Sequence, residues 1–178
     1  MISGKNIIIT GFMGAGKSTV GKKIASMLKR DFYDTDKIIE KEQNRTISNI
    51  FREDGEDYFR LLEKLVVTDI SRKTDFVIAS GGGTLLNKDN LEMLTQTGIV
   101  FCLTANIDIL ISRMGNRKSR PMVAEKNRAA ILELYESRIN GYNKLPNQID
   151  TSNTSPQEVA DTIIELFNKL HNSLGVIK

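Results

Sequence analysis

Residues 11–18 carry the strongest chemical signal in the chain. They read Gly-Phe-Met-Gly-Ala-Gly-Lys-Ser and fit the phosphate-binding pattern G-x-x-x-x-G-K-[ST] at every fixed position. Glycines let backbone N–H groups approach phosphate oxygens, and the helix that follows turns its positive end toward them. In this pattern the lysine, Lys17, reaches the outer phosphates and the Ser18 hydroxyl serves Mg²⁺. An apolar run at 6–10 and a helical pattern at 17–29 flank the loop, which favours a nucleotide site over a chance glycine-rich turn.

Two carboxylates, Asp34 and Asp36, follow the second apolar run of the chain. At this spacing, in a strand or tight turn, both side chains point the same way. One would hold Mg²⁺ through water, and the other would accept the proton of a hydroxyl nucleophile during phosphoryl transfer. Asp-Thr-Asp before a helical pattern is by itself equally typical of a helix N-cap, but its place after a phosphate loop favours the functional interpretation.

Glycines and arginines further along the chain also have two interpretations. Residues 81–83 are three glycines, which form a tight turn or let a ligand approach the backbone closely. Arg60 precedes Glu63 by one helical turn, and exposed pairs of this kind contribute little. Arg138 has the same two interpretations, because an arginine on a helix can also be an ordinary solvent-exposed side chain. A small anionic substrate would nevertheless favour arginines, because their planar fork binds a carboxylate through two hydrogen bonds.

A basic, polar stretch lies near residues 115–124. It fits a solvated loop, a nucleic-acid patch, or a lid that closes over ATP and brings an arginine to the transferring phosphate. No aromatic residues interleave with its charges to stack bases, which disfavours nucleic acid.

Composition limits the class of protein. The chain has 178 residues, 40% of them hydrophobic and 26% charged, with a net charge of +3. No apolar run approaches the length of a membrane span, and the first residues do not resemble a secretion signal. The single cysteine, Cys102, fits a reducing compartment, and one histidine with one cysteine excludes a zinc site built from those ligands. We therefore expect a cytoplasmic protein that binds neither membranes nor nucleic acid.

Strand and helix patterns alternate along the chain, which predicts an α/β fold in three layers, a parallel sheet with helices on both faces. No linker or repeat divides residues 1–178, so we expect a single domain. The expected strands are 6–10, 32–33, 76–79, 99–103 and 148–150. The expected helices are 17–29, 36–71 with breaks near 44–45 and 54–55, 90–96, 106–114, 125–142, and one from Pro156 behind a Ser155–Glu158 capping box.

A switch GTPase is disfavoured, because none of the three Asn-Lys pairs continues into the guanine-reading Asn-Lys-x-Asp. A small-molecule kinase remains the leading class. Within it, the residues resemble the shikimate kinase family, which has a nucleoside-monophosphate-kinase-like phosphate-loop fold. The matching segments are 11–19, 34–36, Phe59-Arg60 with Glu63, 81–83, Arg120-Pro121, and Arg138 with Tyr142.

The resemblance implies a five-stranded parallel sheet, a helical substrate-binding segment at about 36–62 and a mobile lid at about 115–125. It also implies transfer of the γ-phosphate of ATP to the 3-hydroxyl of shikimate, with Mg²⁺ as cofactor, in aromatic amino-acid synthesis. The implied nucleotide-binding residues are Gly14, Ala15, Gly16, Lys17, Ser18, Thr19, Arg113, Arg120, Asn153 and Pro156. The implied substrate-binding residues are Asp36, Arg60, Gly81, Gly82, Gly83 and Arg138. Lys17, Asp36 as base and Arg120 from the lid are the implied catalytic residues, and Ser18 with Asp34 the metal-binding ones.

One departure from the family pattern lies at residues 139–141, which read Ile-Asn-Gly where the family commonly has a small residue, proline and an apolar residue. It predicts a looser helix end after Arg138. The competing functions are a gluconate or other hydroxyl-directed kinase and a nucleotide-binding regulatory module without catalysis. We expect a monomer whose only partners are the small-molecule substrates.

Overall fold

In the computed structural model, which describes residues 4–115 and 128–175, five parallel strands form one sheet in the order β2-β3-β1-β4-β5. In the register of the sheet, Ile7 of the central strand pairs with Val77 on one side and Ile99 on the other. The predicted α/β fold with a five-stranded parallel sheet is confirmed. The strands are β1 (Asn6–Gly11), β2 (Phe32–Asp34), β3 (Val77–Ala79), β4 (Gly98–Thr104) and β5 (Gln148–Asp150).

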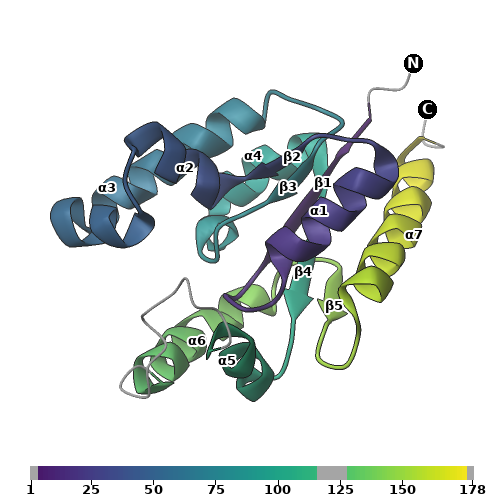
Figure 1. The fold of residues 1–178 in the computed structure, drawn as a ribbon. Coiled ribbons are helices and arrows are strands. Elements are labelled where there is room, and N and C mark those ends of the chain that lie inside the picture. The colour runs from purple at the N-terminus through teal and green to yellow at the C-terminus, as the bar shows by residue number, and fades with distance from the viewer. Residues whose placement is uncertain (1–3, 116–127, 176–178) are drawn as a thin grey trace.

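Helices connect successive strands and surround the sheet. Figure 1 shows α1 and α7 side by side, α2 and α3 projecting together at one side of the sheet, and α5 and α6 packed together at another. The helices are α1 (Lys17–Leu28), α2 (Thr35–Gln43), α3 (Ile47–Ile70), α4 (Lys88–Thr97), α5 (Ile107–Gly115), α6 (Arg128–Tyr142) and α7 (Pro156–Gly175), with a 3-10 turn η1 (Thr84–Leu86).

The central strand explains why the sheet is covered on both faces. All six residues of β1 are buried, and its Ile7-Ile8-Ile9 run offers β-branched side chains to both sides. The capping box of α7 forms as predicted, because Glu158 accepts from the Ser155 amide at 2.7 Å and donates its own amide to the Ser155 hydroxyl at 3.2 Å.

The long helical segment after β2 divides where the sequence predicts. The chain leaves the first helix at Asn44, which has a φ of 49°, and begins the next at Ile47. A kink at Gly55, with a φ of 81°, then splits α3, because a left-handed residue interrupts helical hydrogen bonding. The first three residues of the expected helix 125–142 lie outside the described part of the chain.

Within residues 4–115 and 128–175, no helix is both long enough and apolar enough to cross a membrane.

A buried amide joins the start of β1 to its neighbours. The side chain of Asn6, which is fully buried, donates to the carbonyl of Lys73 at 2.7 Å and to the hydroxyl of Thr97 at 3.3 Å. Its oxygen accepts from the Phe76 amide at 2.9 Å. One side chain therefore aligns the entry to β3 with the end of α4.

We expect Asn6→Ala to lower the free energy of unfolding by about 2–3 kcal/mol, because it leaves the Lys73 carbonyl and the Phe76 amide without their partner. Urea denaturation measures the change. Asn168→Ala, at an exposed position of α7, is the control and should change the value by less than about 0.5 kcal/mol. Equal effects of the two substitutions would contradict the role of Asn6.

Candidate active site

The phosphate loop leaves the carboxyl end of β1 and enters α1 through left-handed glycines. Gly14 has a φ of 84°, and Gly16, the N-cap of α1, has a φ of 96°. A Cβ on Gly14 would also lie 2.7 Å from the carbonyl oxygen of Leu110. Glycine is therefore required there by both conformation and space. The loop keeps the amides at the start of α1 directed outward, which suits an anion.

Lys17 folds back over this loop. Its ammonium donates to the carbonyls of Gly11 at 2.8 Å and Phe12 at 3.2 Å. The positive charge therefore sits at the mouth of the loop, where the outer phosphates of a nucleotide would lie.

The two aspartates near the junction of β2 and α2 contact different residues. Asp34 accepts from the Ser18 hydroxyl at 2.6 Å and also caps α2 by accepting from the Lys37 amide at 3.2 Å. Asp36 lies in the first turn of α2, and its Oδ1 is 2.5 Å from where a Cβ on Gly81 would lie. Asp36 does not lie in a strand or tight turn, since α2 already begins at Thr35, and the alternative of a helix N-cap is confirmed at Asp34.

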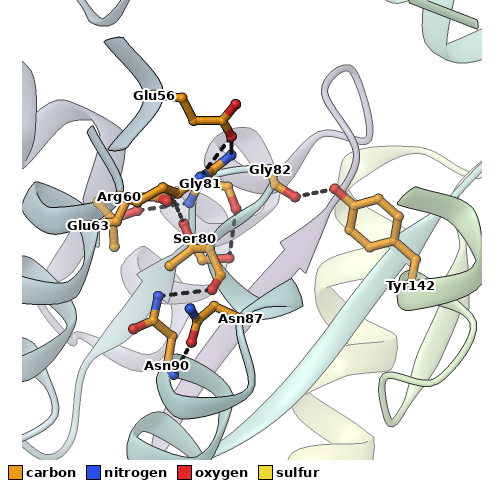
Figure 2. Close-up of polar contacts among 11 residues, drawn as sticks. Glu56, Arg60, Glu63, Ser80, Gly81, Gly82, Asn87, Asn90 and Tyr142 are labelled. Atoms are coloured by element: carbon orange, nitrogen blue, oxygen red, sulfur yellow. Dashed lines mark hydrogen bonds and ion pairs between the residues drawn. The ribbon is translucent and has the colours of Figure 1, made fainter. Parts of the chain in front are cut away.

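Residues 81–83 follow β3 and lie against the predicted substrate-binding side chains, as Figure 2 shows in part. A Cβ on Gly83 would lie 3.0 Å from Nη1 of Arg60, and one on Gly82 would lie 3.8 Å from Nη1 of Arg138. The loop is fixed by the Gly81 amide, which donates to the buried Thr35 hydroxyl at 2.8 Å. The structure thus brings Asp36, Arg60 and Arg138 together around the three glycines.

Arg60 is held by two carboxylates of very different exposure (Figure 2). Its Nη1 donates to Glu63 at 2.5 Å, and its Nη2 donates to Glu56 at 2.7 Å. The Glu63 side chain is 2% exposed and that of Glu56 is 61% exposed. Burial opposes the charge of Arg60, but the hydrogen bonds to Glu63 and Glu56 outweigh it and raise the pKa of the guanidinium. The interpretation of Arg60 and Glu63 as a weak surface pair is therefore wrong.

Glu63 also organises the loop behind the arginine. Its second oxygen accepts from the Thr84 hydroxyl at 2.5 Å. The carbonyl of Thr84 in turn accepts from the side-chain Nδ2 of Asn90 at 3.1 Å. The buried carboxylate thus connects Arg60 to η1 and α4.

Arg138 projects from α6, which continues without interruption through Gly141 to Tyr142. The expected looser helix end after Arg138 is therefore wrong. A Cβ on Gly141 would lie 2.9 Å from Cδ2 of Leu86, so the glycine allows the last turn of α6 to pack closely against η1.

A cavity of about 380 Å³ opens beside the phosphate loop. Arg113 lies at its wall and is fixed to Thr151, whose hydroxyl and carbonyl accept from it at 3.0 and 2.5 Å. Asn153 does not line it. No local sequence pattern singles out Thr151, although its place just after β5, at the carboxyl edge of the sheet, is where ligands bind in such folds. The lining residues are Gly14, Ala15, Gly16, Thr19, Val20, Arg113, Thr151, Thr154, Pro156 and Val159.

Arg120 and residues 116–125 of the expected lid lie outside the described residues. The role of Arg120 stays a prediction. Within the described ranges, no three His, Cys, Asp or Glu side chains are grouped to hold a metal ion. Ser18 and Asp34 are the oxygen donors beside the phosphate loop, and they suit Mg²⁺, which keeps several waters and takes few protein ligands.

The buried and exposed carboxylates on Arg60 allow a matched test. We expect Glu63→Ala to lower the free energy of unfolding by about 2–4 kcal/mol, because it strips a buried charge partner from Arg60 and a hydrogen-bond partner from Thr84. Glu56→Ala removes the exposed partner of the same arginine and should cost less than about 1 kcal/mol. Urea denaturation compares them, and a larger loss at Glu56 would reverse this assignment.

Comparison with known proteins agrees with this geometry. The shikimate kinase family model matches residues 13–168. The shikimate kinase of Thermoanaerobacter pseudethanolicus is 43% identical over 93% of this chain and 98% of its own. Among solved structures, shikimate kinase from Acinetobacter baumannii in complex with shikimate has a TM-score of 0.85 at 34% identity, covering 96% of each chain.

More distant structures share the fold alone. A gluconokinase from Sinorhizobium meliloti has a TM-score of 0.59 at 15% identity, covering 95% of this chain and 97% of its own. Because the family model spans most of the chain and relatives above 30% identity cover nearly all of it, the chain belongs to the shikimate kinase family.

Proposed function

We propose that this protein transfers the γ-phosphate of ATP to the 3-hydroxyl of shikimate, giving shikimate 3-phosphate for aromatic amino-acid synthesis. The observation that carries the proposal is the position of Gly82. A Cβ there would lie 3.9 Å from the carbonyl oxygen of Gly11, where the phosphate loop begins, and 3.8 Å from Nη1 of Arg138. A phosphate donor in the loop and an anionic acceptor among the arginines would therefore be neighbours.

The donor side follows from the phosphate loop. Lys17 and the loop amides would hold the β- and γ-phosphates, and the cavity between the loop, Arg113 and Thr151 would receive the rest of the nucleotide. Ser18 and Asp34 would hold Mg²⁺ together with water. When bound, the ion neutralises charge on the phosphate oxygens.

The acceptor side follows from the three charged residues around the glycines. Arg60 and Arg138 would bind the carboxylate of shikimate, and the glycines leave room for its ring. Asp36 would orient the 3-hydroxyl and accept its proton as the oxygen bonds to the γ-phosphorus. The bond from phosphorus to the bridging oxygen breaks, and ADP leaves. Arg120, from the lid, would add positive charge at the transferred group.

The relatives support this acceptor. Two relatives that are 43% and 42% identical carry the name shikimate kinase, and the Acinetobacter baumannii structure is a complex with shikimate. A sugar kinase and a gluconokinase among the solved structures are only 17% and 15% identical to this chain. We also propose that the protein works in the cytoplasm, where ATP is available and its free, buried Cys102 would stay reduced, and that it acts as a monomer.

The direct test is ADP release from Mg·ATP with shikimate, gluconate, a nucleoside monophosphate or no acceptor. We expect release only with shikimate. Turnover with gluconate instead would keep the kinase and overturn the acceptor. ATP binding without turnover on any acceptor, in folded protein, would favour a regulatory module.

Removing the proposed base separates chemistry from binding. We expect Asp36→Asn to lower kcat by about 10²- to 10⁴-fold, because the amide cannot accept the hydroxyl proton, while KM for ATP stays within about twofold. Asp57→Asn makes the same charge change at an exposed site of α3 and should leave kcat unchanged. Steady-state kinetics with both substrates varied gives the comparison, and parallel losses of kcat and ATP affinity would argue against a base.

A further inference from the structure

Tyr142 ends α6 and is buried, with 2% of its surface exposed. Its hydroxyl donates a hydrogen bond to the carbonyl of Gly82, sixty residues earlier in the chain (Figure 2). Arg138 precedes it by four residues, so both side chains lie on one face of the helix. The tyrosine therefore reaches the glycine loop beside the arginine proposed to bind the acceptor.

Three groups meet at Gly82. A Cβ there would lie 3.8 Å from the Tyr142 hydroxyl and 3.8 Å from Nη1 of Arg138. Burial raises the pKa of Tyr142 to about 12, and the charge of Arg138 and a hydrogen bond with it act in the opposite direction. The phenol is therefore neutral at physiological pH. Its one proton goes to Gly82, and its oxygen lone pairs remain for the guanidinium of Arg138.

The Tyr142 ring also packs against an aromatic side chain of the phosphate loop. Phe12 of the phosphate loop, 3% exposed, meets the Tyr142 ring edge-on at 6.3 Å and the Tyr135 ring edge-on at 5.2 Å. The hydroxyl of Tyr135 has no hydrogen-bond partner within the described residues, whereas that of Tyr142 is committed to Gly82. The two tyrosines of α6 thus share one aromatic neighbour and differ in what their hydroxyls do.

The hydroxyl has a specific consequence for Arg138. Gly82 is partly buried, and its carbonyl accepts from the phenol. Without the phenol, that carbonyl would be available to an N–H of Arg138, whose Nη1 lies 3.8 Å from where a Cβ on Gly82 would lie. An arginine bound to the loop backbone has fewer N–H groups for a ligand carboxylate, and its fork turns away from it.

We propose that Tyr142 is a positioning residue: its hydroxyl satisfies the Gly82 carbonyl and orients Arg138, leaving the guanidinium directed at the acceptor carboxylate. This inference rests on the proposed function, because it gives Arg138 a carboxylate to bind. It predicts that loss of one hydroxyl weakens the acceptor and leaves the nucleotide unaffected.

The test compares Tyr142→Phe with Tyr135→Phe, which removes the other hydroxyl on the same helix. We expect Tyr142→Phe to raise KM for shikimate about fivefold to tenfold, with KM for ATP and the Tm close to wild type. Tyr135→Phe should leave both KM values unchanged. A Tyr142→Phe variant with wild-type KM for shikimate, or with equal rises in both KM values, would overturn the proposal.

A double-substitution cycle separates positioning from general packing. If Tyr142 acts through Arg138, Tyr142→Phe should add no further increase in KM for shikimate in an Arg138→Ala background. An undiminished rise in that background would overturn the proposal. Wild-type protein without shikimate-dependent turnover would refute the proposed function, and this role with it. Wild-type turnover with an unaffected Tyr142→Phe variant would refute the role alone.

Discussion

The candidate site depends on residues 81–83 being glycines, which have no side chain. A Cβ on Gly81 would lie 2.5 Å from Asp36 and 2.7 Å from the Thr84 hydroxyl, which is too close for any real contact. One on Gly83 would press on Arg60 at 3.0 Å. The charged groups converge because the backbone between them occupies so little space. The parallel sheet contributes the other half of this arrangement, since β1, β2 and β3 all deliver their carboxyl ends to the same edge.

Two arginines at one site repel each other and lose hydration, so each needs its own support. Arg60 forms ion pairs with a buried carboxylate, Glu63, and with an exposed one, Glu56. Arg138 lies beside a neutral phenol, whose pKa is raised by burial to about 12. A second buried carboxylate there would pair with the guanidinium and compete with an anionic ligand. A neutral hydroxyl orients the arginine and leaves its charge available.

The sequence is sufficient for the fold and for the charged residues that gather at the three glycines, and less so for the partners of those residues. The phosphate-loop pattern, the strand and helix alternation and the capping box at Ser155 are local features, and each formed where expected. The environment of Glu63 was not predictable, because spacing on a helix says which residues pair and not how deeply they are buried. The hydrogen bonds from Arg113 to Thr151 and from Tyr142 to Gly82 each join segments that lie far apart in the chain. No local sequence pattern encodes such contacts.

The departure at residues 139–141 shows how a local rule is overridden by packing. An Asn-Gly pair favours a helix end or turn, yet α6 continues to Tyr142. The close approach of Gly141 to Leu86 explains this, since a side chain there would meet Cδ2 at 2.9 Å and hold the last turn away from η1. The intrinsic cost of a helical glycine, about 1 kcal/mol, is offset by the buried contacts of the aromatic residue that follows it. That last turn carries Tyr142 to Gly82, so the glycine that weakens the helix locally is also what allows its end to reach the acceptor side of the site.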